Sequence, residues 1–199
     1  MSRKVLDILT STIGVVVVVV LVVAGGLLTW GHSFVNSNVR TQLSQQQIYF
    51  PPKAAFAHAK AGTEITPSMI PSVSQYAGQQ LLTGQQAKVY ANDFIAVHLS
   101  EMPYGGVYSK ISAASMANPK DTKLAGLKQT AFTGTTLRGL LLEAYAFSMI
   151  GTVMLVGAIA SFTAAAILSI LVGLGFWHAT RTATETQVLR RKTKAVPAS

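Results

Sequence analysis

Charged residues are missing from two long stretches of the chain. The first covers residues 13–30 and includes six consecutive valines, and the second covers residues 144–177. About 20 apolar residues in a helix are needed to cross the hydrocarbon core of a bilayer. Valine favours strands in water, but in lipid the backbone must satisfy its own hydrogen bonds, so a helix forms. The pattern therefore predicts two transmembrane helices.

The first stretch has two interpretations. Arg3 and Lys4 precede it, and Val22 with Ala24 resembles a signal-peptidase site, which is typical of a cleaved signal peptide. The apolar run nevertheless continues past this point to Trp30. We therefore expect an uncleaved signal anchor over residues 13–30, after a short N-terminal segment of residues 1–12.

The second stretch is longer than a bilayer requires. Its 34 residues would extend about 51 Å as one helix. A helical hairpin is the alternative, but each arm would have only about 16 residues, and the stretch contains no proline or polar turn cluster. We therefore expect one long helix over residues 138–177 that includes the second span.

The intervening residues, 31–137, alternate between helical patterns and helix breakers. Val35, Val39 and Leu43 predict an amphipathic helix that ends before Pro51. Further helical segments are expected over about residues 72–101 and 109–117, and from Asp121, which is placed to cap a helix. Strand and hairpin signals are few. The predicted fold class is all-α, with two transmembrane helices flanking a small helical domain.

The distribution of charge predicts the orientation of the chain. The net charge is +9, and basic residues flank both spans on the side of the termini. By the positive-inside rule, both termini are expected in the cytoplasm, which places residues 31–137 outside. The tail, residues 178–199, contains a basic cluster expected to contact anionic lipid headgroups: Arg190, Arg191, Lys192 and Lys194. Without a basic stripe on a recognisable fold, a nucleic-acid partner is not expected.

Candidate catalytic chemistry is sparse. His98 and Glu101 lie three residues apart on an expected helix, but two ligands are too few for a metal site. The chain has no cysteine, no nucleophile elbow and no P-loop. We therefore expect no catalysis, no metal and no cofactor.

The second span carries a regular series of small residues. Small residues four positions apart allow two membrane helices to approach closely. The partner helix could be the first span or a helix of another chain, including a second copy. The series comprises Gly157, Ser161, Ala165, Ser169 and Gly173.

Several short motifs together resemble a family. They are Gln-Ile-Tyr-Phe-Pro at 47–51, Tyr-Ala-Gly-Gln-Gln at 76–80, Phe-Ile-Ala-Val-His-Leu at 94–99, and Leu-Arg-Gly-Leu-Leu-Leu at 137–142 followed by Ala-Tyr-Ala-Phe at 144–147. The set resembles a group of uncharacterised actinobacterial two-span membrane proteins. The resemblance implies a bacterial plasma-membrane protein with a domain on the outer side, and it implies no activity and no site residues.

Three functions are compatible with these features. We expect a non-catalytic accessory, scaffold or assembly component that binds a partner through its outer domain and membrane helices. The first alternative is an extracytoplasmic ligand sensor, which would need a separate signalling partner because the tail is short. The second alternative is a cell-envelope enzyme that acts through His98 and Glu101.

Overall fold

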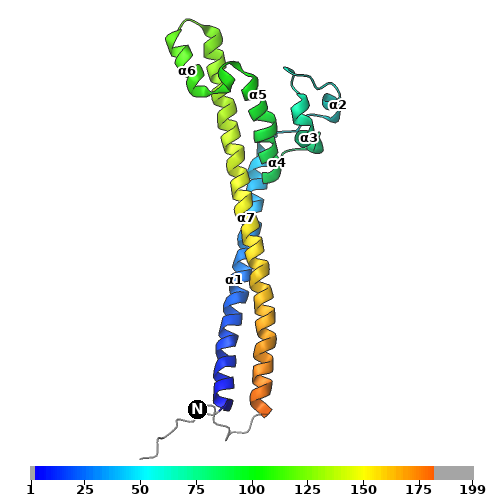
Figure 1. Ribbon diagram of the computed structural model, residues 1–199, viewed down its shortest axis with the longest axis vertical. Helices are drawn as coiled ribbons and strands as arrows, with labels where there is room; N and C mark the ends of the chain where they lie inside the picture. Colours follow the sequence, from blue (N-terminus) through cyan, green and yellow to red (C-terminus); the bar gives the residue numbers. More distant parts are fainter. Residues whose placement is uncertain (1–2, 182–199) are drawn as a thin grey trace, which may run out of the picture. The chain divides into compact units, whose positions relative to one another are not determined.

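The computed structural model describes residues 3–181 and is all-α. The chain begins with one long helix, α1 (Arg3–Gln45), and the described part ends with another, α7 (Thr122–Arg181). A series of short helices lies between them in the sequence (Figure 1). Within the described residues the only β-type pairing is an isolated antiparallel bridge between Tyr49 and Gln80. Residue contacts divide the chain into two compact units, one made of residues 1–30 and 154–199 and the other of residues 31–153. Each unit is described separately.

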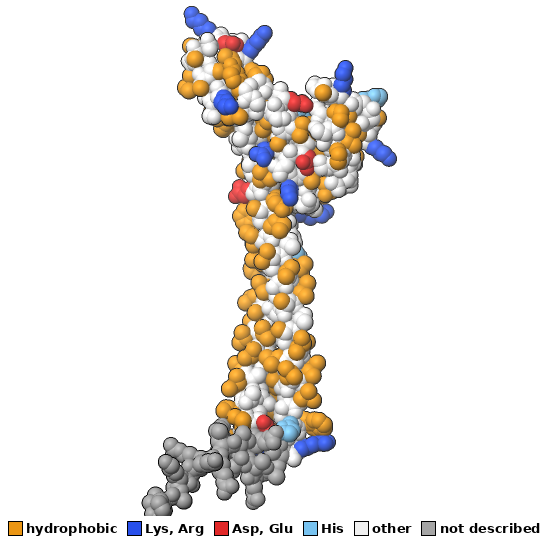
Figure 2. Space-filling view, in the orientation of Figure 1, with side chains coloured by type: hydrophobic (Ala, Val, Ile, Leu, Met, Phe, Trp, Pro, Cys, Tyr) orange, Lys and Arg blue, Asp and Glu red, His pale blue; other side chains and the backbone are white. Residues whose placement is uncertain are grey.

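The first unit contains the most apolar segments of both long helices. Each helix is long and apolar enough to span a membrane, with a mean hydropathy of 2.7 in the best window of α1 and 2.4 in that of α7. Figure 2 shows hydrophobic side chains along the surface of this paired segment. Most of them are exposed, among them Val16, Val20, Leu27, Val156, Ile159 and Ile170. Side chains of this kind are stable on the outside of a helix pair when lipid surrounds it.

The two helices of this unit run antiparallel and share a seam with a regular spacing. Ser11 of α1 lies against Gly175 of α7, and Leu28 lies against Gly157. The buried and half-buried positions follow alternating steps of three and four residues, which is the 3.5-residue period of left-handed helix pairs. In α1 the positions that keep this spacing are 7, 11, 14, 18, 21, 25 and 28, and in α7 they are 154, 158, 161, 165, 168, 172, 175 and 179; positions 4, 24 and 157 are half-buried in addition.

The second unit has its hydrophobic core between the end of α1, the middle of α7 and the chain segments that lie between them in sequence. Fully buried side chains include Leu43, Phe50, Met69, Leu81 and Leu141. Its short elements are α2 (Lys53–Phe56), η1 (Pro67–Met69), α3 (Ile70–Val73), η2 (Ser74–Tyr76), α4 (Gly84–Val89), η3 (Tyr90–Ile95), α5 (Ala96–Glu101), η4 (Pro103–Gly106) and α6 (Tyr108–Ala117).

The expected continuous helical region over residues 72–101 is interrupted. Gly78 adopts a φ of +71°, in the left-handed region that favours glycine, and the following residues are extended. The Phe50 amide donates to the Gln79 carbonyl at 2.9 Å, and the Leu81 amide donates to the Ile48 carbonyl at 2.9 Å. These long-range backbone bonds replace the helical bonds that the sequence pattern predicted.

The restart of the helix at α4 is fixed by local capping. The side chain of Thr83 accepts a bond from the Gln86 amide, and the Gln86 side chain accepts one from the Thr83 amide, which forms a capping box. The predicted cap at the start of α7 is confirmed, because the Asp121 carboxylate accepts from the amides of Lys123 and Leu124. The helix that follows is continuous through Arg181, with no hairpin turn.

A chain of aromatic rings crosses this second unit and has Tyr90 at its centre. The Tyr90 ring lies 5.3 Å from Phe50 and 4.8 Å from Phe94, measured between centroids. Phe94 in turn lies 4.6 Å from the His98 ring. Tyr90 belongs to the π-helical segment η3, in which an extra residue changes the facing of the side chains. Tyr90, Phe94 and Val97 are all partly buried and packed against the core.

The environment of Tyr90 predicts a loss of stability at high pH. Burial, and to a smaller extent the Glu64 carboxylate, raise the pKa of Tyr90 above its ordinary value of 10.0. The unfolded chain then loses this proton at a lower pH than the folded chain. The contribution of Tyr90 to the free energy of unfolding is complete below about pH 10 and is lost as the pH rises toward the folded pKa.

Tyr90→Phe should remove this part of the pH dependence, measured by denaturant unfolding of the detergent-purified protein between about pH 9 and 11. Tyr49→Phe, at an exposed tyrosine, is the matched control; equal slopes for wild type and Tyr90→Phe would contradict the assignment.

Candidate functional site

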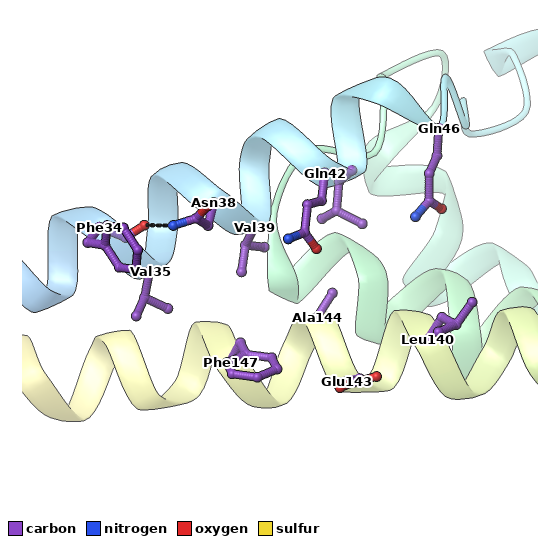
Figure 3. A pocket seen from close by; sticks show the side chains of 11 residues that line it. Phe34, Val35, Asn38, Val39, Gln42, Gln46, Leu140, Glu143, Ala144 and Phe147 are labelled. Atoms are coloured by element: carbon purple, nitrogen blue, oxygen red, sulfur yellow. Dashed lines mark hydrogen bonds between the residues drawn. The ribbon is translucent and has the colours of Figure 1, made fainter.

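A groove between α1 and α7 is the feature of the second unit that could best hold another molecule. It encloses about 480 Å³, and all its lining residues belong to residues 31–153 (Figure 3). From α1 it is lined by Phe34, Val35, Asn38, Val39, Gln42 and Leu43, from the turn that follows α1 by Gln46, and from α7 by Leu140, Glu143, Ala144 and Phe147. The groove is therefore formed where α1 and α7 run antiparallel to each other within residues 31–153, outside their most apolar segments.

The floor and the rims of the groove differ in chemistry. The floor is apolar, since Val39 and Leu43 are buried there and Ala144 is half-buried. The α1 rim repeats every four residues at Phe34, Asn38 and Gln42, and Gln46 extends it just past the end of the helix. Residues at this spacing are neighbours along one face of a helix.

The polarity of the rims changes along the groove. Figure 3 shows Phe34 at one end with Phe147 opposite Asn38, and Gln42 and Gln46 toward the other end, where Leu140 also lies. Glu143 is the one charged lining residue and is exposed. The sequence pattern did not indicate a groove at Glu143.

A histidine bridges the two helices in the same unit. The Nδ1 atom of His32 lies 2.7 Å from the carbonyl oxygen of Gly151. A carbonyl only accepts, so Nδ1 carries the proton. The Asn36 amide nitrogen lies 3.2 Å from Nε2 and 3.3 Å from Nδ1 of the same ring. The His32 ring thus links α1 to α7 through the Gly151 carbonyl.

The five small residues of the second span do not share one environment. Ala165 is buried, Ser161 is half-buried and Gly157 lies beside Leu28, with 3.1 Å from its would-be Cβ to Leu28 Cδ1. Ser169 and Gly173 are exposed, and a Cβ at Gly173 would have no neighbour within 4 Å. The structure therefore places the first three toward α1 and leaves the last two on an open surface. A role in packing for all five stays a prediction.

The other predicted residues are separated or lie elsewhere. His98 Nδ1 bonds to the Phe94 carbonyl at 2.8 Å, within its own helical segment. Among residues 3–181, no group of three or more His, Asp or Glu side chains is arranged to hold a metal ion. The predicted lipid contacts Arg190, Arg191, Lys192 and Lys194 lie outside the described residues.

Comparison with known proteins adds no assignment: no family model, no curated protein and no solved structure matches this chain. The class that the fold itself defines is an all-α chain with two helices long and apolar enough to span a membrane. The groove can hold an elongated molecule by contact with an apolar floor and can orient it by hydrogen bonds at the rims.

Proposed function

We propose that this chain is an integral protein of a bacterial plasma membrane that acts as a non-catalytic scaffold or assembly component. In this proposal α1 and α7 each cross the bilayer, both termini are cytoplasmic, and the helical unit between them is extracytoplasmic. The basic residues near both termini and the exposed apolar side chains of the paired helices support this arrangement.

One observation in particular supports a binding role. One side of α7 packs on α1 through Ala158, Ala165 and Ala179, whereas Ser169 and Gly173 are exposed. Small residues on an open helix face permit close approach of a further membrane helix. The second span therefore has a surface for a partner, either a different protein or a second copy, in addition to the surface used within the chain.

Gly173→Leu tests this surface. The leucine side chain should block close approach and lower recovery of the partner severalfold, because helix association in lipid depends on backbone proximity. The measurement is purification in mild detergent, followed by determination of the mass of the complex and identification of stoichiometric components. Gly26→Leu is the matched control, since a Cβ at Gly26 also has no neighbour within 4 Å. A wild-type protein that purifies only as a monomer would contradict the scaffold role.

A further inference from the structure

The groove between α1 and α7 has the polarity of an amphiphile. Phe34 lies at one end and Phe147 lies opposite Asn38, and the polar side chains of Gln42 and Glu143 follow toward the end where Gln46 and Leu140 lie (Figure 3). Its floor stays apolar, with Val39 8% and Leu43 2% exposed. A ligand that matches this surface has an elongated apolar part and a hydrogen-bonding head.

We propose that the groove binds one phospholipid with an ammonium-bearing headgroup, such as phosphatidylethanolamine. The proposal rests on the proposed membrane location of the chain. An acyl chain lies on the apolar floor between Phe34 and Phe147. The ammonium group donates to the Glu143 carboxylate, and the phosphate oxygens accept from the side-chain amides of the α1 rim.

Charge selects this headgroup. Glu143 is the one charged residue that lines the groove, so a cationic group is attracted and a headgroup with only negative charge is repelled. The amides of Gln42 and Gln46 can donate to phosphate and also accept from the ammonium group. A zwitterionic headgroup satisfies both kinds of group at once.

The dimensions and the position of the groove in the chain agree with a lipid. The rim from Phe34 to Gln42 rises about 12 Å at 1.5 Å per residue. Phe34 follows Trp30 by four residues and Phe147 precedes Gly151 by four, so the end at which Phe34 lies is the end nearest to both apolar segments in the sequence. An apolar partner helix in the groove would instead leave Glu143 and the amides facing apolar side chains, which is unfavourable.

Photolabelling in nanodiscs tests the proposal with the full-length protein. Two lipid probes carry the same diazirine acyl chain, one with a phosphatidylethanolamine head and one with a phosphatidylglycerol head. We expect labelling of the α1 and α7 peptides that contain Phe34 and Phe147, with the phosphatidylethanolamine probe preferred. Labelling spread over the apolar surface without enrichment at these peptides, or capture of another protein there in place of lipid, would overturn it.

Substitutions separate the two halves of the site. Glu143→Gln should reduce the preference for the ammonium headgroup by up to about fivefold, the upper end for a solvent-exposed ion pair. Phe34→Ala should reduce labelling by both probes. The matched controls are Glu101→Gln and Phe132→Ala, exposed residues of the same unit that do not line the groove. Equal effects of Glu143→Gln and Glu101→Gln would overturn the headgroup assignment.

Alkaline carbonate extraction distinguishes failure of this inference from failure of the proposed function. A chain that stays in the membrane pellet but shows no enriched groove labelling overturns the lipid site alone. A chain that is released by carbonate overturns the membrane function on which the site rests.

Discussion

Replacing Gly106 with alanine should destabilise the second unit by about 3 kcal/mol. Gly106 has a φ of +66°, where a Cβ is strained, and it is buried. A Cβ there would overlap the carbonyl oxygen of Leu99 and lie 2.7 Å from its carbonyl carbon. Because these are backbone atoms, the turn between α5 and α6 would have to move. Denaturant unfolding of the full-length protein in detergent, followed by tyrosine absorbance or fluorescence, measures the loss.

The neighbouring glycine provides the control for this effect. Gly105 has nearly the same φ, +65°, but a Cβ there would have no neighbour within 4 Å. Gly105→Ala should therefore cost only the conformational strain, about 1 kcal/mol. If both variants lost the same stability, the close packing of Gly106 on Leu99 would not be what requires glycine.

Gly25→Leu should separate the two helices of the first unit. Gly25 is buried in the seam, and a Cβ there would lie 2.9 Å from the ring of Phe162. A leucine would displace this ring and widen the seam, at about 1–3 kcal/mol for overpacking. Since the chain has no cysteine, Leu28→Cys with Gly157→Cys provides a reporter disulfide across the same seam. Its rate of oxidation should fall severalfold.

Gly26→Leu is the adjacent control for this measurement. It adds the same side chain one residue further along α1, at a position with no neighbour within 4 Å. The oxidation rate should then remain near that of the parent pair. Equal slowing by both substitutions would show that added bulk on α1, rather than packing in the seam, is responsible.

The long apolar helices could be predicted because their signal is in the composition. Residues 13–30 and 144–177 contain no charge, and such segments form helices in lipid whatever their neighbours. The cap at Asp121 was also predictable, because capping depends on a few adjacent residues. These features require no knowledge of long-range contacts.

The residues through which α7 packs on α1 were harder to predict from the sequence. A stripe that repeats every four residues rotates by about 40° per step around a helix of 3.6 residues per turn. From Gly157 to Gly173 the stripe therefore turns through about 160°, which carries Ser169 and Gly173 away from α1. The observed seam alternates between steps of three and four residues. Read with a seven-residue period, the sequence would have indicated Ala158, Ala165, Val172 and Ala179.

The features that depend on long-range contacts could not be predicted. The break at Gly78 arises because residues 79 and 81 bond to residues 50 and 48, and no local pattern indicates this pairing. The groove likewise requires α1 and α7 to be antiparallel with their rims aligned. Each rim taken alone, such as Asn38 and Gln42, resembles an ordinary solvated helix face.

The crossing of a bilayer by both helices is tested most directly with single cysteines in this cysteine-free chain. Lys60→Cys is in the second unit, Val17→Cys is in the first apolar helix and Ser199→Cys is at the C-terminal end. A membrane-impermeant maleimide is applied to intact bacterial cells and, separately, to permeabilised cells. We expect labelling of Lys60→Cys in intact cells, of Ser199→Cys only after permeabilisation, and of Val17→Cys only after denaturation. Labelling of Ser199→Cys in intact cells, or ready labelling of Val17→Cys in the native protein, would contradict this expectation.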